Sequence, residues 1–248
     1  MLKKALQERS LLSLKTSIKN VVAKVNFAGI FARVIFIGGA VSSSIVFANP
    51  AVPNLPKLAL PTGGQVVAGN ASINSSTTSN SATMNINQTS QRAVINWDSF
   101  NVGKNATVNF NQPNANAVTL NRVTGAEASQ IDGLLNANGQ VWVLNPNGVM
   151  IGKTGQVNAA GFLASTLSIS NEDFIQGKYQ FTSPSGTSSG IIRNQGSINV
   201  PNGYAILSGS QVVNEGVIQA NLGQVVLAAG NATTLDLVGD KLLSFSVT

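Results

Sequence analysis

Side chains that could carry acid–base or metal chemistry are few in this sequence and lie far apart. The chain has no His and no Cys, which removes the usual metal ligands and the commonest general base. We predict that its carboxylates are solvated surface groups, and that the chain has no catalytic residue, no metal site and no cofactor. After position 48 these carboxylates fall singly, with one adjacent pair: Asp98, Glu127, Asp132, Glu172, Asp173, Glu215, Asp236 and Asp240.

Hydroxyl and glycine patterns add no catalytic motif. Ser165 and Ser168 have no His as a base, and no motif supports a dyad with Lys153 or Lys178. The Gly63-Gly64 pair lacks the Walker pattern of a phosphate-binding loop. The sequence therefore contains no recognisable catalytic motif.

The positive charge of the chain is concentrated at its N-terminus. Residues 1–48 hold seven basic residues and one acidic residue, and seven minus one gives the whole formal net charge of +6. An uncharged apolar run follows at 34–47 and ends in a small-residue cleavage pattern. This order predicts an extended Sec signal peptide over 1–48, cleaved between Ala48 and Asn49, with an amphipathic membrane anchor as the alternative. Because the remainder is formally neutral, we reject nucleic acid as a partner.

One stretch of the remaining chain, Val141–Gly152, stands out. Two apolar runs flank Asn145-Pro146-Asn147-Gly148. Pro146 suits the second position of a turn, Asn145 can bond its own backbone two residues on, and Gly148 supplies conformational freedom. The stretch therefore predicts a strand, a sharp corner and a second strand.

The late part of the chain repeats itself every 20 residues. The segment 193–200 matches 213–220, and each segment holds short apolar strands separated by Gly or Asn. A fixed period of this size, without room for helices, predicts an all-β chain that forms a parallel β-helix of about ten coils. Asn194 and Asn214 are expected to stack as a side-chain ladder at equivalent corners.

The predicted domain organisation follows from composition. After the leader, residues 49–62 form a proline-rich lead-in, and residues 63–248 form the β-helix, whose first strands over 63–90 make an N-terminal β cap. The final apolar segment, 242–248, is expected to be a strand with an open edge. We therefore expect the domain to be truncated from a longer protein.

The order and spacing of several motifs resemble the amino-terminal secretion domain, or TPS domain, of two-partner secretion exoproteins of the filamentous haemagglutinin family. The likeness is greatest to the high-molecular-weight adhesin branch, and it extends over roughly residues 60 to 248. The segments that carry it are Ala93–Gly103, Ala117–Thr124, Asn138–Gly152, Gly161–Leu167 and Asp236–Phe245.

The resemblance implies that the β-helix is right-handed and has an N-terminal cap, and it also implies a function and partners. Such a domain crosses the inner membrane by the Sec machinery. It is then recognised by an outer-membrane TpsB-type β-barrel transporter with periplasmic POTRA domains, and it initiates β-helix folding as the exoprotein reaches the cell surface or the medium. Host-cell glycans or proteins are further candidate partners.

The resemblance also assigns a secretion motif, Asn145, Pro146, Asn147 and Gly148. The family's second motif, Asn-Pro-Asn-Leu, is absent from its expected position. The nearest match there is Gln112-Pro113-Asn114, a weak candidate.

Two other function classes remain open at this point. A β-helix enzyme acting on polysaccharide would gather carboxylates and basic residues in one groove, and a glycan-binding module would use the flat sheet faces. For the secretion motif, direct contact with the transporter and a purely structural corner are equally compatible with the turn chemistry. An Asn145→Asp substitution is expected to keep the turn and so to separate the two roles.

Overall fold

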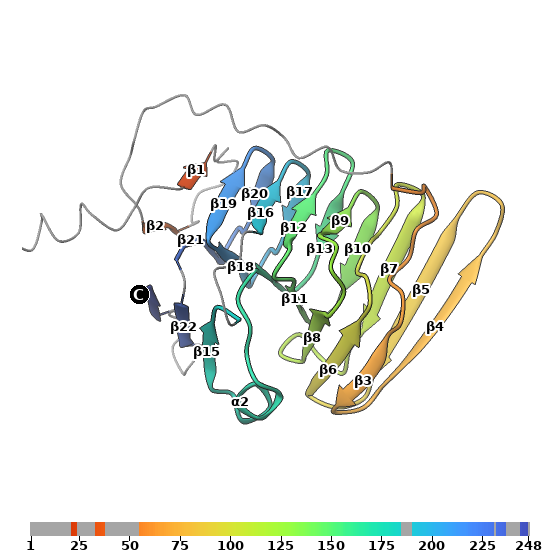
Figure 1. Cartoon of the computed structure of the whole chain (residues 1–248), viewed down its shortest axis with the longest axis horizontal. Coiled ribbons are helices and arrows are strands. Elements are labelled where there is room, and N and C mark those ends of the chain that lie inside the picture. The colour runs from red at the N-terminus through yellow and green to blue at the C-terminus, as the bar shows by residue number, and fades with distance from the viewer. Residues whose placement is uncertain are drawn as a thin grey trace, which may run out of the picture.

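Short strands joined by tight corners make up most of the residues that a computed structural model describes (Figure 1). The structure describes residues 21–23, 33–37, 55–184, 190–230, 232–236 and 244–247, with side chains over 55–184 and 190–230. The elements are β1 (Val21–Ala23), β2 (Arg33–Ile37), β3 (Gln65–Ala68), β4 (Ala71–Thr77), β5 (Ala82–Gln88), β6 (Arg92–Trp97), β7 (Ala106–Asn111), β8 (Val118–Val123), β9 (Ser129–Ile131), β10 (Leu134–Ala137), β11 (Gln140–Leu144), β12 (Gly148–Ile151), β13 (Gln156–Asn158), β14 (Gly161–Ser165), α2 (Asn171–Gln176), β15 (Tyr179–Thr182), β16 (Ile191–Asn194), β17 (Ser197–Asn199), β18 (Tyr204–Gly209), β19 (Gln211–Asn214), β20 (Val217–Gln219), β21 (Gln224–Ala229), β22 (Ala232–Asp236) and β23 (Ser244–Val247).

Three parallel sheets form the walls of a right-handed β-helix, as predicted. Sheet 1 has the order β4-β5-β7-β10-β13-β17-β20, sheet 2 β3-β6-β8-β11-β14-β18-β21-β2, and sheet 3 β9-β12-β16-β19-β1. Successive strands of the chain pass from sheet 1 to sheet 2 to sheet 3, so each circuit adds one strand to each wall. Figure 1 shows these strands stacked along the long axis of the molecule.

The number of coils is smaller than the sequence repeat predicted. The described part of sheet 1 holds six strands in parallel register, β5 to β20, instead of about ten. The 20-residue period applies only to the last coils, as between Ser197 and Val217. An earlier coil is longer, with 27 residues between Thr107 and its register partner Leu134. Longer corners and an insertion after β14 account for the difference.

Sheet 2 is buried on both faces, which explains its nearly continuous apolar strands. In β11, Val141 and Val143 face the core inside the coils, whereas Trp142 and Leu144 belong to a second apolar cluster outside them. Because side chains alternate along a strand, one five-residue segment serves both cores. A run such as Val141–Leu144 therefore has no polar face for solvent.

The N-terminal end of the coil stack is covered by the predicted β cap. Strand β3 pairs antiparallel with β6, and β4 pairs antiparallel with β5. Strand β5 is itself the first strand of the parallel coil, so the cap consists of β3, β4 and the lead-in. Residues 57–62 of that lead-in bond to the first coil, for example through the Asn105 N–H donating to the Lys57 carbonyl at 2.8 Å. These antiparallel pairings protect the edge of the first coil.

An excursion over residues 166–184 leaves the coils after β14 and packs against the outer face of sheet 2. It contains α2, which is capped by the Ser170 side chain, and β15. The Trp142 ring lies edge-on to Phe174 and to Tyr179, with centroid distances of 5.3 and 4.8 Å. Strand β15 continues into a small antiparallel sheet with β22 and β23. Aromatic packing thus holds the excursion on the coil.

Arg122 in β8 ties this excursion to the coil by polar contacts. Its guanidinium donates to the Ile169 carbonyl at 2.6 Å and to the Asn171 Oδ1 at 2.7 Å. Burial lowers the pKa of Arg122 from its usual value. The guanidinium stays charged, because an arginine pKa remains far above neutral.

Substituting Arg122 by Ala should loosen the excursion. Three charge-assisted hydrogen bonds are lost, two of them to the excursion and one to the Asn96 Oδ1. The Ile169 carbonyl also loses its donor, so we expect the free energy of unfolding to fall by about 2 kcal/mol. Limited proteolysis should cut residues 166–184 faster than in the parent chain. Lys104→Ala changes an exposed cation elsewhere and is the control. Equal cleavage rates in the two variants would show that Arg122 does not anchor the excursion.

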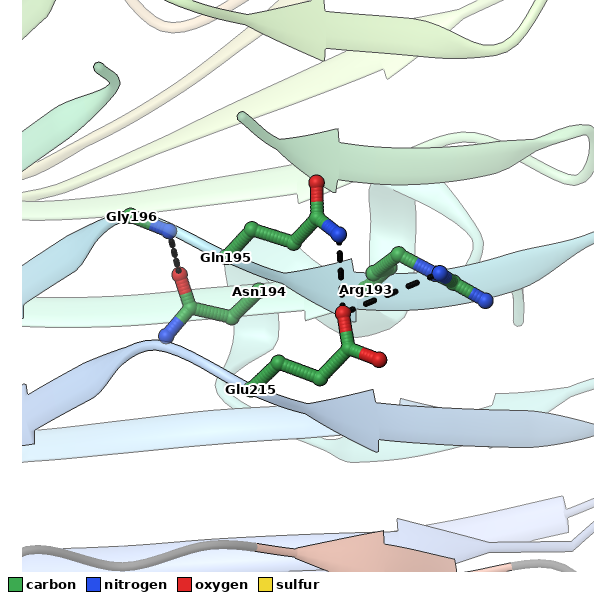
Figure 2. A network of polar contacts seen from close by, with 5 residues as sticks. All are labelled: Arg193, Asn194, Gln195, Gly196 and Glu215. Carbon is green, nitrogen blue, oxygen red and sulfur yellow. Dashed lines mark hydrogen bonds and ion pairs between the residues drawn. The ribbon is translucent and has the colours of Figure 1, made fainter. Parts of the chain in front are cut away.

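The predicted side-chain ladder is confirmed at the end of sheet 3. The Asn194 Nδ2 donates to the Asn214 Oδ1 at 2.7 Å, and both side chains are buried. Figure 2 shows the same corner: the Gly196 N–H donates to the Asn194 Oδ1, and Glu215 receives the Gln195 amide at 2.8 Å. Arg193 lies 3.7 Å from the same carboxylate. The repeat thus places an Asn at the same corner of two successive coils, where it forms hydrogen bonds both within a coil and between coils.

The predicted leader lies largely outside the described residues, and so does its cleavage site at Ala48 and Asn49. Within it, β1 pairs in parallel with β19 and β2 with β21. In the described part of the chain no helix is long and apolar enough to span a membrane. The predicted terminal strand within 242–248 corresponds to β23, which pairs antiparallel with β22. The signal peptide itself stays a prediction.

Candidate functional site

The corner between β11 and β12 is formed by Asn145-Pro146-Asn147-Gly148. The Gly148 N–H donates to the Asn145 carbonyl at 2.9 Å, which closes a four-residue turn with Pro146 in its second position. The Asn147 N–H donates to the Asn145 Oδ1 at 2.9 Å, as the sequence predicted. Local chemistry therefore fixes the backbone of the corner.

The Asn145 side chain also bonds to the preceding coil. Its Nδ2 donates to the Glu127 carbonyl at 2.9 Å and to the Ser129 Oγ at 3.0 Å, and the side chain is fully buried. Its backbone N–H donates to the Ser165 carbonyl of the following coil at 2.9 Å. Asn145 thus joins three successive coils, a role that a turn residue alone would not require.

Gly148 is required by both conformation and space. Its φ is +112°, a region that residues with a side chain rarely adopt. A Cβ there would also lie 2.8 Å from the Ile191 carbonyl oxygen of the next coil. The corner is therefore packed so closely against β16 that only glycine fits.

The solvent-facing part of this corner is small. Asn147 is exposed and Pro146 is half-buried, whereas Asn145 and Gly148 are buried. The Asn147 Nδ2 donates to the Gly125 carbonyl at 3.0 Å, an exposed contact. In the folded domain a partner could therefore touch Pro146 and Asn147, but not the Asn145 amide.

The weak candidate motif, Gln112-Pro113-Asn114, forms a different corner, between β7 and β8. Gln112 is buried, and its Nε2 donates to the Gln140 carbonyl at 2.9 Å and to the Ala117 carbonyl at 3.1 Å. Its Oε1 accepts the Gly139 N–H at 3.0 Å. Pro113 and Asn114 are exposed. Gln112 therefore fastens its corner to the next coil much as Asn145 fastens its own.

The structure does not bring the two candidate motifs together. Gln112 bonds to Gln140, the first residue of β11, whereas Asn145 follows Leu144, the last residue of that strand. A five-residue strand spans roughly 16 Å, so the corners lie at opposite ends of sheet 2. Any partner that contacts both must extend across the sheet.

Among the side chains that the structure describes, the carboxylates form no cluster that could hold a metal ion, since no group of three or more His, Cys, Asp or Glu is placed to bind one. Glu172 and Asp173 lie in the first turn of α2, where carboxylates favour the helix dipole. Glu215 lies beside Arg193, as described above. These placements give each of the three carboxylates, Glu172, Asp173 and Glu215, a structural or surface role.

Comparison with known proteins identifies the family. A family model described as the TPS secretion domain matches residues 59–245. The chain belongs to the TPS secretion domain family. This is the family to which the sequence motifs pointed, and it is a secretion domain of two-partner secretion exoproteins, not an enzyme family. Membership in it implies a cognate TpsB outer-membrane transporter, and exoproteins of this kind are exported across the outer membrane.

Two curated relatives carry the printed name heme/hemopexin-binding protein. One, from Haemophilus influenzae strain Rd, is 40% identical over 185 residues, which are 72% of this chain and 20% of that protein. Another, from Haemophilus influenzae, is 48% identical over 99 residues, which are 40% of this chain and 11% of that protein. This chain thus spans at most about a fifth of the length of these relatives.

A solved structure supports the same assignment. The crystal structure of the HMW1 secretion domain from Haemophilus influenzae matches with a TM-score of 0.66 and 37% identity, over 76% of this chain and 48% of that chain. The predicted resemblance to the high-molecular-weight adhesin branch is therefore confirmed.

Sequence reasoning missed the residues that fasten the corners and the excursion. It assigned no role to Ser129, which receives the Asn145 amide, or to Arg122, which anchors the excursion. For Arg122 the available signal was that it is a lone Arg within an apolar strand, in the segment Ala117–Thr124. The contact of Ser129 with Asn145 depends on the register between coils, so no local feature of the sequence could have predicted it.

Proposed function

We propose that this TPS domain directs export by presenting its secretion motif to a cognate TpsB transporter before the coil formed by β10, β11 and β12 closes. The domain crosses the inner membrane through the Sec machinery, and the periplasmic POTRA domains of the barrel bind it while it is unfolded. Folding outside the cell then buries the motif. The observation that carries the proposal is the complete burial of the Asn145 side chain in the folded β-helix.

Burial of Asn145 gives the process a direction. A partner that binds the Asn145 amide competes with Glu127 and Ser129 for the same donor. The bound and folded states therefore exclude each other at this residue. Closure of the coil that holds Asn145 removes this binding site for the transporter, which favours release of the chain outside the cell over its return.

Free energy for export without ATP comes from coil formation in this proposal. Each added coil pairs three short strands with the previous coil and extends the apolar core. Stability of a repeat protein grows roughly as a sum of such nearest-neighbour terms. Folding that proceeds coil by coil on the outer side opposes backward diffusion of the chain.

The first test measures export of this chain from cells with and without the cognate barrel. We expect the chain in the culture medium only when the barrel is present, because the outer membrane blocks a folded domain of this size. The variant Asn147→Ala is measured beside the parent chain, because it changes a residue of the motif and removes only one exposed hydrogen bond. Equal amounts in the medium with and without the barrel would refute the proposal.

A binding experiment separates recognition from folding. Purified periplasmic domains of the barrel should capture chain freshly diluted from urea and fail to capture the folded chain. A different result is that the periplasmic domains capture the folded chain as strongly as the chain diluted from urea, and lose this capture with Asn147→Ala. That result would place recognition on the exposed part of the corner. In that case the order of binding and folding proposed above is wrong.

We also propose that this domain is not catalytic and that the activity of the exoprotein lies in its other parts. Support comes from the dispersed carboxylates among the described side chains. The heme/hemopexin binding in the relatives' names applies to proteins about five times longer than the matched region, as the 20% coverage shows. Whether the host-facing activity of this exoprotein is similar is a separate question from export.

A further inference from the structure

A long groove follows one edge of the β-helix, where sheet 1 passes into sheet 2. Its volume is about 900 Å³, and its lining runs from the end of β7 to the start of β21. Corner length explains the hollow. Six residues connect β7 to β8 and four connect β17 to β18 and β20 to β21, whereas only two connect β10 to β11 and β13 to β14. The short corners form the floor between longer ones.

The lining of the groove is neutral and rich in amides. Ten of its twenty residues are Asn or Gln, and none carries a formal charge. Tyr204 is the single lining residue that could ionise, and burial raises its pKa above the usual value. Its hydroxyl already donates to the Gln140 Oε1 and accepts from the Trp142 indole N–H. A charged ligand would therefore find no counter-charge in this groove.

An asparagine ladder crosses the floor of the groove and stops partway along it. The Asn136 Nδ2 donates to the Asn109 Oδ1, and the Asn158 Nδ2 donates to the Asn136 Oδ1, both at 3.1 Å. Asn199 is the register partner of Asn158 in the next coil, yet no hydrogen bond joins their side chains. Within the described part of the chain, the side-chain amides of Asn199 and Asn202 make no hydrogen bond to another side chain or to the backbone. Both line the groove.

Apolar atoms lie beside these amides. Ala137, Ala160 and Pro201 line the groove, and Leu222 stands at its rim with 72% of its surface exposed. A sugar ring presents hydroxyl groups at its edge and C–H groups on its faces. Amides that can both donate and accept, next to a small apolar surface, match both parts of such a ring.

We propose that this groove binds a neutral oligosaccharide lying along the solenoid axis. The amides recur once per coil, at about 4.8 Å, the spacing of neighbouring strands. One pyranose unit of an extended glycan advances by a similar distance. Alternate residues of an extended peptide recur at roughly 6.7 Å, so a peptide running along the axis would lose register with the amides. The inference does not depend on the export proposal, because no residue of the secretion motif lines the groove.

Calorimetric titration of the full chain with neutral hexasaccharides tests this site. The probes are cellohexaose, maltohexaose and chitohexaose, with a heparin hexasaccharide and an uncharged twelve-residue Gly-Ser peptide for comparison. We expect at least one neutral hexasaccharide to bind. The double variant Asn199→Ala, Asn202→Ala should weaken that binding at least about tenfold, because two amide groups lose their hydrogen bonds to the sugar.

The control is Gln195→Ala, which removes an amide that bonds to Glu215 and does not line the groove. It should change the affinity by less than about twofold, since its contacts are remote from the site. Circular dichroism of both variants checks that the coil is intact. The proposal is wrong if no neutral hexasaccharide binds at millimolar concentration. It is equally wrong if the double variant binds like the parent, or if the heparin fragment or the peptide binds more tightly than every neutral probe.

Discussion

Asn145→Leu should unfold the coil formed by β10, β11 and β12 and abolish export. The substitution removes the donor from the Glu127 carbonyl and the Ser129 hydroxyl, and the acceptor from the Asn147 N–H. Each buried polar group left unpaired costs about 1–3 kcal/mol, so we expect a loss of roughly 4 kcal/mol in the free energy of unfolding. Urea denaturation followed by circular dichroism measures this loss, and secretion with the cognate barrel measures its consequence.

Contrary to the sequence-based expectation, Asn145→Asp does not separate recognition from folding. A carboxylate can still accept the Asn147 N–H, but it cannot donate to the Glu127 carbonyl or the Ser129 hydroxyl. It would also place a charge in a site with no solvent exposure. Asn145→Asp therefore tests folding and recognition together.

The variant that separates recognition from folding is at Asn147. Its side chain is exposed and makes a single exposed hydrogen bond, so Asn147→Ala should cost less than about 1 kcal/mol. If Asn145→Leu remains as stable as Asn147→Ala, the inter-coil role of Asn145 is refuted. Loss of export in Asn147→Ala with normal stability would show that the exposed part of the corner contacts the transporter.

Trp142→Ala should detach the excursion from sheet 2. The indole packs against Phe174, Tyr179 and Phe181, and its N–H donates to the Tyr204 hydroxyl at 2.8 Å. Truncation of a fully buried Trp leaves a large cavity and costs roughly 3–5 kcal/mol. We expect a lower urea midpoint, and fluorescence of the remaining Trp97 reports whether the coil core unfolds with the excursion.

Trp142→Phe is the matched control for this prediction. It keeps an aromatic ring against Phe174 and Tyr179 and removes the hydrogen bond to Tyr204. We expect a loss of about 1–2 kcal/mol, from one lost hydrogen bond and a smaller ring. If Trp142→Ala and Trp142→Phe have the same stability, aromatic packing does not hold the excursion.

The sequence by itself determined the local structure of this protein. The turn at Asn145–Gly148 follows from four adjacent residues, because its hydrogen bonds join residues only two or three positions apart. The 20-residue period predicted stacked coils and the Asn194–Asn214 ladder, because identical coils place identical residues above one another. The dispersed carboxylates and the absence of His and Cys already argued against catalysis.

Only the tertiary structure decided what these local features contact. Asn145 is buried because residues 16 and 18 positions earlier, Ser129 and Glu127, are brought onto it by the register between β9 and β12. The groove depends on differences in length between corners of successive coils, which a search for a constant period averages away. The second core depends on an excursion that returns to Trp142 from more than 30 residues along the chain. Long-range register, not local turn chemistry, sets which side chains are buried and which face a partner.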